Sequence, residues 1–240
     1  MSKTVLITGG NRGIGIGLVK EYLKRQDFSF VFVTARENSN KAPLGYLKCS
    51  KLIVLDMDVC DDASIRAAAQ AVAEKTGGKL DVVINNSGVL NNYELSAEPD
   101  QDSLIEQFEV NTVGPVLVTQ RFLKLLLKSG TPEKPSLVVN ISSSLASITL
   151  CEGSTPRNYT PYRMSKAALN MFTRSLAIDF REENIVIVSM APGWVRTAMG
   201  TSAAELSIEE STSAMMNSFD KIKKEHSGRC FDRHLMDVPL

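Results

Sequence analysis

The chain has 240 residues, of which 43% are hydrophobic and 22% are charged, and its formal net charge is zero. These proportions indicate a folded globular domain, and the balanced charge argues against a nucleic-acid-binding protein, because no basic excess is present to neutralise phosphates. The N-terminal MSKTVLIT runs directly into a strand-like segment, and no apolar run approaches the roughly 20 residues of a membrane span. We therefore expect a protein that contacts neither nucleic acid nor membrane.

The cysteines and histidines are scattered. The four cysteines, Cys49, Cys60, Cys151 and Cys230, form no CxxC pair, and both histidines lie near the C-terminus. The ligand spacing of known zinc sites and the pattern of a disulfide framework are therefore absent. We expect reduced thiols, a cytoplasmic location and no bound metal.

Short apolar runs alternate with helical patterns along the chain. The runs are rich in Val, Ile and Leu without polar alternation, which predicts parallel strands that are covered on both faces. The expected strands are 4–8, 28–34, 51–57, 80–85, 136–142 and 184–190, and the expected helices are 14–26, 62–76, 101–129 and 161–182. This alternation predicts an α/β fold: one Rossmann-type domain over 1–240, with a doubly wound parallel sheet flanked by helices.

Two later segments are expected to be loops. Residues 149–161, TLCEGSTPRNYTP, are rich in Gly, Pro, Ser and Thr, and residues 198–212 form the second loop. A polar helix is expected to begin at Ser207, because Glu210 follows three residues later in a capping-box pattern. The last residues, GRCFDRHLMDVPL, are expected to hold one short final strand.

Glycines cluster directly after the first expected strand. The stretch TGGNRGIGIG places Gly9, Gly13 and Gly15 as GxxxGxG ahead of a helix, which differs from the usual GxGxxG dinucleotide fingerprint. The spacing still permits a tight turn, a close approach of the backbone to phosphate, and a helix N-terminus that faces the negative charge. A glycine-rich turn without a ligand is the alternative.

Two arginines lie where a bound dinucleotide would place its adenosine ribose. The second strand ends VTARE, with Ala35 where an NAD-preferring dehydrogenase usually has an acidic residue and Arg36 next. Together with Arg12 of the glycine loop, Arg36 favours the additional 2′-phosphate of NADP. Glu37 is a mild counter-signal, and either arginine alone could be an ordinary solvated charge.

Six motifs follow one another in order along the chain. They are TGGNRGIG (8–15), NNSG (85–88), the asparagine of VNTVG (110–114), ISS (141–143), YRMSK (162–166) and PGWVRT (192–197). From residue 4 to about 197 the chain resembles the short-chain dehydrogenase/reductase family, most closely its sniffer-type carbonyl reductases. The resemblance implies that the chain uses NADPH to reduce a small carbonyl compound, such as an aldehyde, a ketone or a quinone.

The resemblance assigns the proton chemistry to four residues. Tyr162 would donate a proton to the carbonyl oxygen, Ser143 would hydrogen-bond that oxygen, and Asn111, at a helix interruption, would help to hold a water that links Lys166 to solvent. Tyr162 and Lys166 are four residues apart and therefore share a helix face, with Thr160 as the expected N-cap. An unperturbed tyrosine has a pKa of about 10, and an exposed ion pair is too weak to bring it near neutrality. The pair must therefore be partly desolvated and joined by the charge of the cofactor.

The family pattern also implies the cofactor contacts and the substrate loops. The expected NADP(H) contacts lie in the glycine loop and at the carboxyl ends of the strands: Gly9, Asn11, Arg12, Gly13, Ile14, Gly15, Arg36, Asp58, Val59, Asn85, Gly88, Tyr162, Lys166, Pro192, Gly193 and Thr197. The loops 149–161 and 198–212 would shape the substrate site, and the chain would form a homo-oligomer, as a dimer or a tetramer. The alternatives are an NAD-linked alcohol dehydrogenase and a non-catalytic, dinucleotide-sensing signalling protein.

Overall fold

A central parallel sheet forms the middle layer of the computed structural model, which describes residues 2–152 and 157–240. Its strand order is β3-β2-β1-β4-β5-β6-β7. The strands are β1 (Lys3–Ile7), β2 (Phe28–Ala35), β3 (Leu52–Asp56), β4 (Val82–Asn85), β5 (Ser136–Ile141), β6 (Ile185–Ala191) and β7 (Cys230–Asp232). The six expected strands, the short final strand and the doubly wound fold are thus confirmed.

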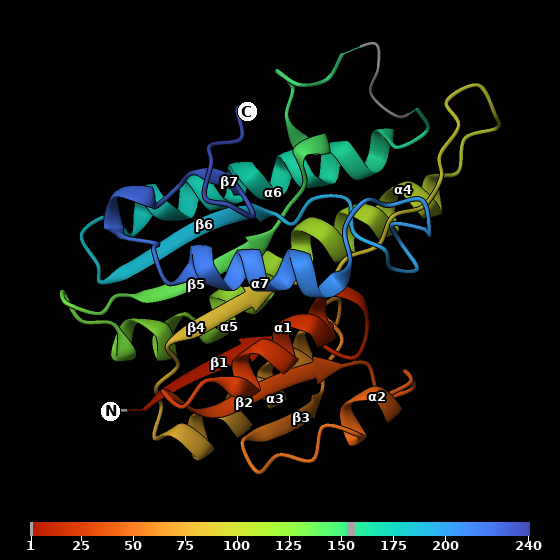
Figure 1. Cartoon of the computed structure of the whole chain (residues 1–240). Coiled ribbons are helices and arrows are strands. Elements are labelled where there is room, and N and C mark those ends of the chain that lie inside the picture. The colour runs from red at the N-terminus through yellow and green to blue at the C-terminus, as the bar shows by residue number, and fades with distance from the viewer. Residues whose placement is uncertain (1, 153–156) are drawn as a thin grey trace.

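Helices cover both faces of the sheet (Figure 1). They are α1 (Gly13–Lys24), α2 (Ala42–Gly45), α3 (Asp62–Thr76), α4 (Gln101–Phe108), α5 (Gly114–Ser129), α6 (Thr160–Asp179) and α7 (Ile208–Phe219), with short turns at η1 (Glu109–Val113), η2 (Ser144–Ala146) and η3 (Lys224–His226). Helices α1 and α7 pack side by side on one face, and α3, α5 and α6 cover the other. Neighbouring residues of β1 show the layering, because Val5 and Ile7 pack beneath α1 and α7 while Leu6 packs beneath α3 and α5.

The direction of winding reverses at β1, which lies between β2 and β4. In such a sheet, ligands bind beyond the carboxyl ends of the strands near this reversal. The loops that follow β1, β4, β5 and β6 carry the glycine loop, NNSG, ISS and PGWVRT, so the fold gathers those motifs at one edge. We call this edge the carboxyl edge and the opposite one the amino edge.

Several helices differ from the sequence-based expectation. The helix expected over 101–129 is divided into α4 and α5 by the π-helical turn η1, which contains Asn111 and is the interruption expected there. Helix α6 has Tyr159 rather than Thr160 at its N-cap, because Thr160 already has helical backbone geometry. The short helix α2 was not expected; four residues are too few to show periodicity.

The two expected substrate loops are shorter than predicted. Residues 160–161 belong to α6, and residues 153–156 lie outside the described residues. The Ser207–Glu210 capping box is present as expected, so residues 208–212 are helical rather than part of the preceding loop. In the described part of the chain, no helix is long and apolar enough to cross a membrane.

Candidate active site

The glycine loop joins β1 to an α1 helix whose N-terminus lacks a side-chain cap. Gly9 and Gly13 have φ values of +62° and +54°, a region that residues with a β-carbon rarely adopt. A β-carbon added at Gly15 would lie 2.3 Å from the carbonyl oxygen of Gly9, so the turn closes tightly only with glycine there. Arg12 occupies the N-cap without a side-chain hydrogen bond, and the first turn contains no acidic residue. The first N–H groups of α1 are therefore available to an anion.

The NNSG turn after β4 connects the glycine loop to the residues of the YRMSK motif. A β-carbon added at Gly9 would lie 2.9 Å from Ser87 Oγ. A β-carbon added at Gly88 would lie 3.2 Å from Asn111 Oδ1 and 3.7 Å from Lys166 Nζ. Glycine at position 88 therefore lets the backbone approach both side chains closely.

Tyr162 lies in the first turns of α6 and is buried, with 8% of its surface exposed. Its hydroxyl hydrogen-bonds the side chain of Ser143, which follows β5. Of the three consecutive serines, Ser142 is buried with a hydroxyl that has no partner among the described residues, and Ser144 is exposed. Burial raises the pKa of Tyr162 to about 12, and the bond with Ser143 opposes part of that rise.

Lys166 lies one turn further along α6 and is only 4% exposed. Its ammonium donates a 2.7 Å hydrogen bond to the carbonyl oxygen of Ile141 and lies 5.9 Å from the centroid of the Tyr162 ring. Burial lowers the pKa of Lys166 to about 8, because the charged form loses its hydration. The pair is desolvated as expected, but Lys166 by itself does not bring the pKa of Tyr162 down.

Asn111 is fully buried in the π-helical turn η1. Its side chain forms a two-way contact with Val89, in which Oδ1 accepts from the N–H at 2.9 Å and Nδ2 donates to the carbonyl at 2.8 Å. Nδ2 also donates to Ser165 Oγ at 3.1 Å, which ties η1 to α6. The expected role of Asn111 is to help hold a water that links Lys166 to solvent. The relay stays a prediction.

A cavity of about 530 Å³ lies beside the ends of β2 and β3. Arg36 and Asp58 line it, as expected for an adenosine pocket, together with Glu37, Asp56 and other residues. Asp56 is paired with Lys41, a basic residue that the sequence analysis did not single out. Arg12 is exposed nearby on the glycine loop but does not line this cavity.

These features fit a dinucleotide cofactor. An elongated ligand needs an anion site at its centre and space at both ends. The uncapped N-terminus of α1 supplies the anion site, and the cavity lined by Arg36 supplies one end. Thr197 lies beside the glycine loop, because a β-carbon added at Gly13 would lie 3.4 Å from Thr197 Cγ2.

Comparison with known proteins identifies the fold family. The short chain dehydrogenase family matches residues 3–207. The chain belongs to the short chain dehydrogenase family. An NADPH-bound carbonyl reductase from chicken fatty liver is 32% identical, with a TM-score of 0.93 over 100% of this chain and 99% of that chain. The carbonyl reductase Sniffer of Drosophila melanogaster is 29% identical, with a TM-score of 0.92 over 100% of both chains.

A third similar protein is named for a signal and not for an enzyme activity. The C-signal protein of Myxococcus xanthus is 38% identical over 162 residues, which are 68% of this chain and 93% of that protein. This chain is therefore similar both to proteins named for an oxidoreductase activity and to a protein named for a signal.

Several expected cofactor contacts of this short-chain dehydrogenase have side chains turned into the protein. Asn85 is 2% exposed and donates to Thr119 Oγ1 and Asn140 Oδ1. Val59 packs against Gly114, and Ile14 packs on the core beneath α1 and α7. Contacts from such residues would come from the main chain.

Other expected contacts take part in local structure. Asn11 donates a 3.0 Å hydrogen bond to the carbonyl of Asn40, which joins the glycine loop to the loop after β2. Pro192 accepts a 2.8 Å hydrogen bond from Ser211 of α7, and Gly193 follows with a φ of +85°.

Two supporting residues were missed in the sequence. Thr8 Oγ1 accepts from the N–H groups of Asn86 and Ser87, and Asn86 Nδ2 donates to the carbonyls of Thr8 and Gly9. These bonds hold the glycine loop against the NNSG turn. Both residues lie inside recognised motifs, but only pairing of β1 with β4 shows that they meet.

Proposed function

We propose that this short-chain dehydrogenase is an NADPH-dependent carbonyl reductase that acts on aldehydes, ketones or quinones. The observation that carries the proposal is the buried residue Tyr162, whose hydroxyl is bonded to Ser143 and which lies one helical turn from a buried Lys166. All three groups lie at the carboxyl edge, beside the glycine loop. A phenol and an alcohol that converge there can hold one carbonyl oxygen between them.

The protonation state of Tyr162 is the one that carbonyl reduction requires. With a pKa raised to about 12, the phenol carries its proton at neutral pH, which is the form that a proton donor requires. Ser143 would orient the substrate oxygen toward that proton, and Lys166 would stabilise the phenolate left behind. When bound, NADPH supplies the hydride and, once oxidised, a positive charge near the phenol. An NAD-linked alcohol dehydrogenase would instead need the phenolate at the start of the reaction.

The preference for NADPH is supported by residues at the adenosine end. Ala35 is 3% exposed and has no polar side chain to bond a ribose hydroxyl, while Arg36 is exposed at the cavity. Among the described residues, Arg36 has no carboxylate within ion-pair distance, so its guanidinium is available to a 2′-phosphate. Glu37, also on the cavity wall, opposes this preference.

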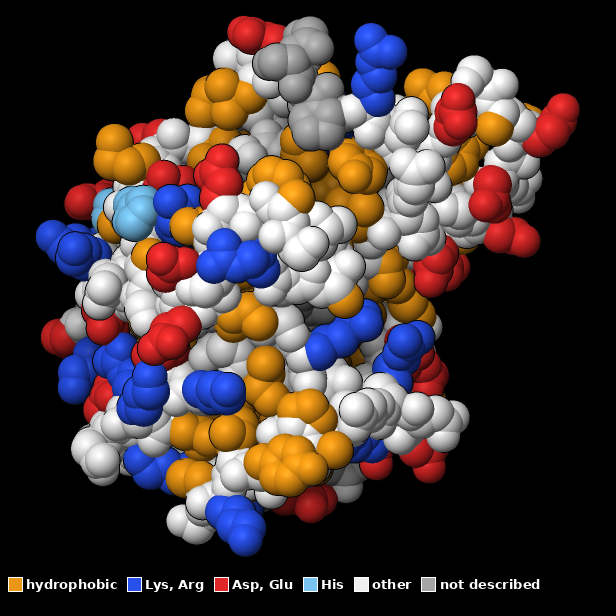
Figure 2. All heavy atoms as spheres, turned by 45° about the vertical axis from the view of Figure 1, so that its right-hand side comes forward, with side chains coloured by type: hydrophobic (Ala, Val, Ile, Leu, Met, Phe, Trp, Pro, Cys, Tyr) orange, Lys and Arg blue, Asp and Glu red, His pale blue; other side chains and the backbone are white. Residues whose placement is uncertain are grey.

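The substrate is expected to be largely apolar. Figure 2 shows hydrophobic side chains exposed in both the upper and the lower half of one face. The loops after β5 and β6 carry Ile148, Leu150, Trp194 and Met199, each at least 41% exposed. Trp194 is held in place by a 2.7 Å hydrogen bond from its indole N–H to the carbonyl of Gly200. These surfaces suit a quinone or an aromatic ketone better than a sugar.

A non-catalytic signalling protein is the second candidate, favoured by the similarity to the C-signal protein. Such a protein could bind the dinucleotide without turnover. The complete set of Asn111, Ser143, Tyr162 and Lys166 weighs against this candidate, because a binding protein has no need of a buried phenol and ammonium.

The decisive measurement is the absorbance decay of NADPH, with NADH in parallel, when the protein meets quinones, dicarbonyls and aldehydes. Decay with NADPH that disappears in Tyr162→Phe supports the reductase. A preference for NADH would refute the role of the arginines, and tight NADPH binding without any decay would favour the signalling candidate.

The cofactor preference has its own test in Arg36→Ala. We expect the Kd for NADPH to rise about tenfold and the Kd for NADH to stay within about twofold, because one charge-assisted hydrogen bond to the 2′-phosphate is lost. Arg181→Ala is the matched control, since that exposed guanidinium pairs with Glu182 beyond α6. Equal changes for both cofactors would contradict the assignment.

We further propose that the enzyme works in the cytoplasm as a homo-oligomer. All four cysteines are free thiols. Met164, Met171 and Ile178 of α6 are exposed at intervals of seven residues, so they form one apolar stripe along that helix. Light scattering of the purified protein tests this proposal, and a monomer at micromolar concentration would contradict it.

A further inference from the structure

The last residues of the chain fold back from the sheet toward the loop that follows β5, at residues 144–150. Strand β7 pairs with β6, and the chain then reverses, so that Asp237 bridges Phe231 in the antiparallel direction. The N–H of Val238 donates to the carbonyl of Cys230 at 2.9 Å. We call residues 233–240 the strap. Figure 1 shows it in dark blue, rising from β7 toward the green loop that follows β5.

Side-chain contacts hold the reversal. The Asp232 carboxylate accepts hydrogen bonds from the N–H groups of His234 at 2.8 Å and Met236 at 2.9 Å. The Nε and Nη2 atoms of Arg229 both donate hydrogen bonds to the carboxylate of Asp237. Leu235 has a φ of +64°, an unfavourable value for a branched side chain, and these contacts compensate for it. These contacts therefore hold the strap in one defined conformation.

The far end of the strap is bonded to the loop between Ser143 and Tyr162. The carbonyl of Leu240 accepts from the N–H of Ile148 at 2.6 Å and from the N–H of Thr149 at 3.2 Å. Ser147 Oγ lies 3.5 Å from the same oxygen. Ile148 and Thr149 have exposed side chains, so this docking depends on the backbone bonds.

The docked loop continues directly into Ser143. Ser143 Oγ caps the turn η2 by accepting from the N–H of Leu145 at 3.1 Å, and the same side chain bonds Tyr162. Within η2, the N–H of Ser147 donates to the carbonyl of Ser144 at 3.1 Å. A short hydrogen-bonded path thus runs from Leu240 through η2 to the Ser143 hydroxyl.

We propose that the strap positions the loop 144–150 over the substrate, so that its docking through Leu240 sets substrate affinity. This inference rests on the proposed reductase function. The strap is bonded to the loop 144–150, whereas the glycine loop is held by the NNSG turn. Loss of the strap therefore weakens binding of the carbonyl compound and does not change binding of NADPH. Leu240 is a positioning residue that acts through its main-chain oxygen.

The test is a variant that lacks Pro239 and Leu240, measured with NADPH and with menadione as the quinone. It keeps the Arg229–Asp237 pair and the Val238 bond. Because two backbone hydrogen bonds to the loop are lost, we expect the KM for menadione to rise about tenfold while the Kd for NADPH stays within about twofold. Hydrogen exchange at the amides of Ile148 and Thr149 is expected to become faster.

Leu240→Ala is the matched control, because it removes the half-exposed side chain and keeps the backbone carbonyl. It should retain both the KM and the slow exchange of the full-length protein. An unchanged KM together with unchanged exchange in the deletion variant overturns the proposal. So does a parallel loss of menadione and NADPH binding, which shows general loosening.

The exchange measurement separates this proposal from the proposed function. If the intact protein turns over no carbonyl compound, the reductase assignment fails. Faster exchange at Ile148 and Thr149 in the deletion variant would then still support the docking of the strap, and unchanged exchange would overturn it.

Discussion

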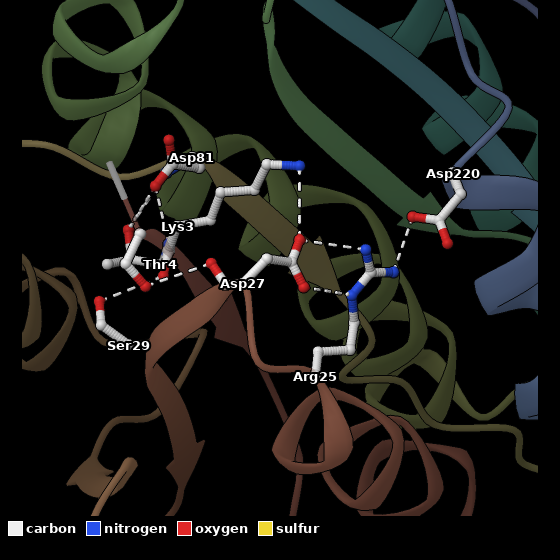
Figure 3. Close-up of polar contacts among 8 residues, drawn as sticks. Lys3, Thr4, Arg25, Asp27, Ser29, Asp81 and Asp220 are labelled. Atoms are coloured by element: carbon white, nitrogen blue, oxygen red, sulfur yellow. Dashed lines mark hydrogen bonds and ion pairs between the residues drawn. The ribbon is translucent and has the colours of Figure 1, made fainter.

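Polar groups at the two edges of the sheet differ in how fully they are hydrogen-bonded. At the amino edge, Asp81 accepts hydrogen bonds from Thr4 N–H at 2.7 Å, Thr4 Oγ1 at 3.0 Å and Ser129 Oγ at 2.7 Å. Beside it, Arg25 pairs with Asp27 and Asp220, which joins the ends of α1 and α7 (Figure 3). These contacts join the start of β1 to the residue before β4 and to the last residue of α5, and they join the end of α1 to the end of α7.

At the carboxyl edge, polar groups are buried with fewer compensating contacts. Among the described residues, the desolvated Lys166 donates only to the Ile141 carbonyl, and the Ser142 hydroxyl has no partner. The N-terminus of α1 lacks the side-chain cap that Asp61 gives to α3. The difference fits the proposed function, in which the amino edge stabilises the fold while the carboxyl edge gives up stability for binding and proton transfer.

The largest expected effect comes from Tyr162→Phe, which removes the proton donor from the carboxyl edge. We expect kcat to fall by roughly 10² to 10⁴, because general-acid catalysis contributes about that much, while NADPH affinity and melting temperature change little. Steady-state kinetics and calorimetry measure these quantities. Tyr159→Phe, at the N-cap of the same helix, should retain turnover. Full activity in Tyr162→Phe would show that this edge is not the catalytic one.

Lys166→Met should be inactive and yet more stable than the parent at pH 7. Below a pH of about 8 the buried ammonium destabilises the folded state, because its folded pKa is about 8 against an ordinary lysine value of 10.5. The penalty is roughly 3 kcal/mol and disappears as the pH rises from 8 to 10.5, where only the unfolded state keeps the proton. Urea unfolding across this range should show the difference between variant and parent shrinking with pH. A difference that does not depend on pH would exclude desolvation of the ammonium as its cause.

Asp81→Ala tests the amino edge, with the opposite pattern of results. We expect the unfolding free energy to fall by roughly 2 to 3 kcal/mol, because three bonds to a carboxylate are lost, and kcat to stay within about twofold. Urea unfolding and NADPH turnover give the two values. Glu133→Ala, on the exposed loop before β5, should change stability by less than about 0.5 kcal/mol. A large loss of turnover in folded Asp81→Ala would remove the distinction between the edges.

The smallest expected effect is that of Arg25→Ala. Its ion pairs with Asp27 and Asp220 are largely solvent-exposed, and its guanidinium lies 5.3 Å from the Phe28 ring centroid. We expect a loss of about 1 kcal/mol at low salt that decreases in 1 M NaCl as the ion pairs are screened. A loss that is the same at both salt concentrations would assign the effect to packing on Phe28 instead.

Features that depend on neighbours in the sequence could be predicted. The alternation of apolar runs and helical patterns determined the parallel sheet, because periodicity reports which faces are buried. The Ser207–Glu210 capping box and the shared helix face of Tyr162 and Lys166 followed from spacings of three and four residues. The family resemblance pointed to Ser143, the serine whose side chain the structure bonds to Tyr162.

Features that depend on burial and on distant segments required the tertiary structure. Sequence spacing suggested an ammonium that lowers the pKa of Tyr162, but desolvation raises it, and Lys166 is bonded to Ile141 on another element. The partners of Asn111 lie 22 and 54 residues away along the chain. The strap joins Leu240 to Ile148 through backbone atoms, which every residue carries and no side-chain pattern reveals. The sequence by itself thus determined the fold and pointed to the candidate catalytic residues, whereas the tertiary structure decided their burial and positioning, because both depend on which segments exclude water from each other.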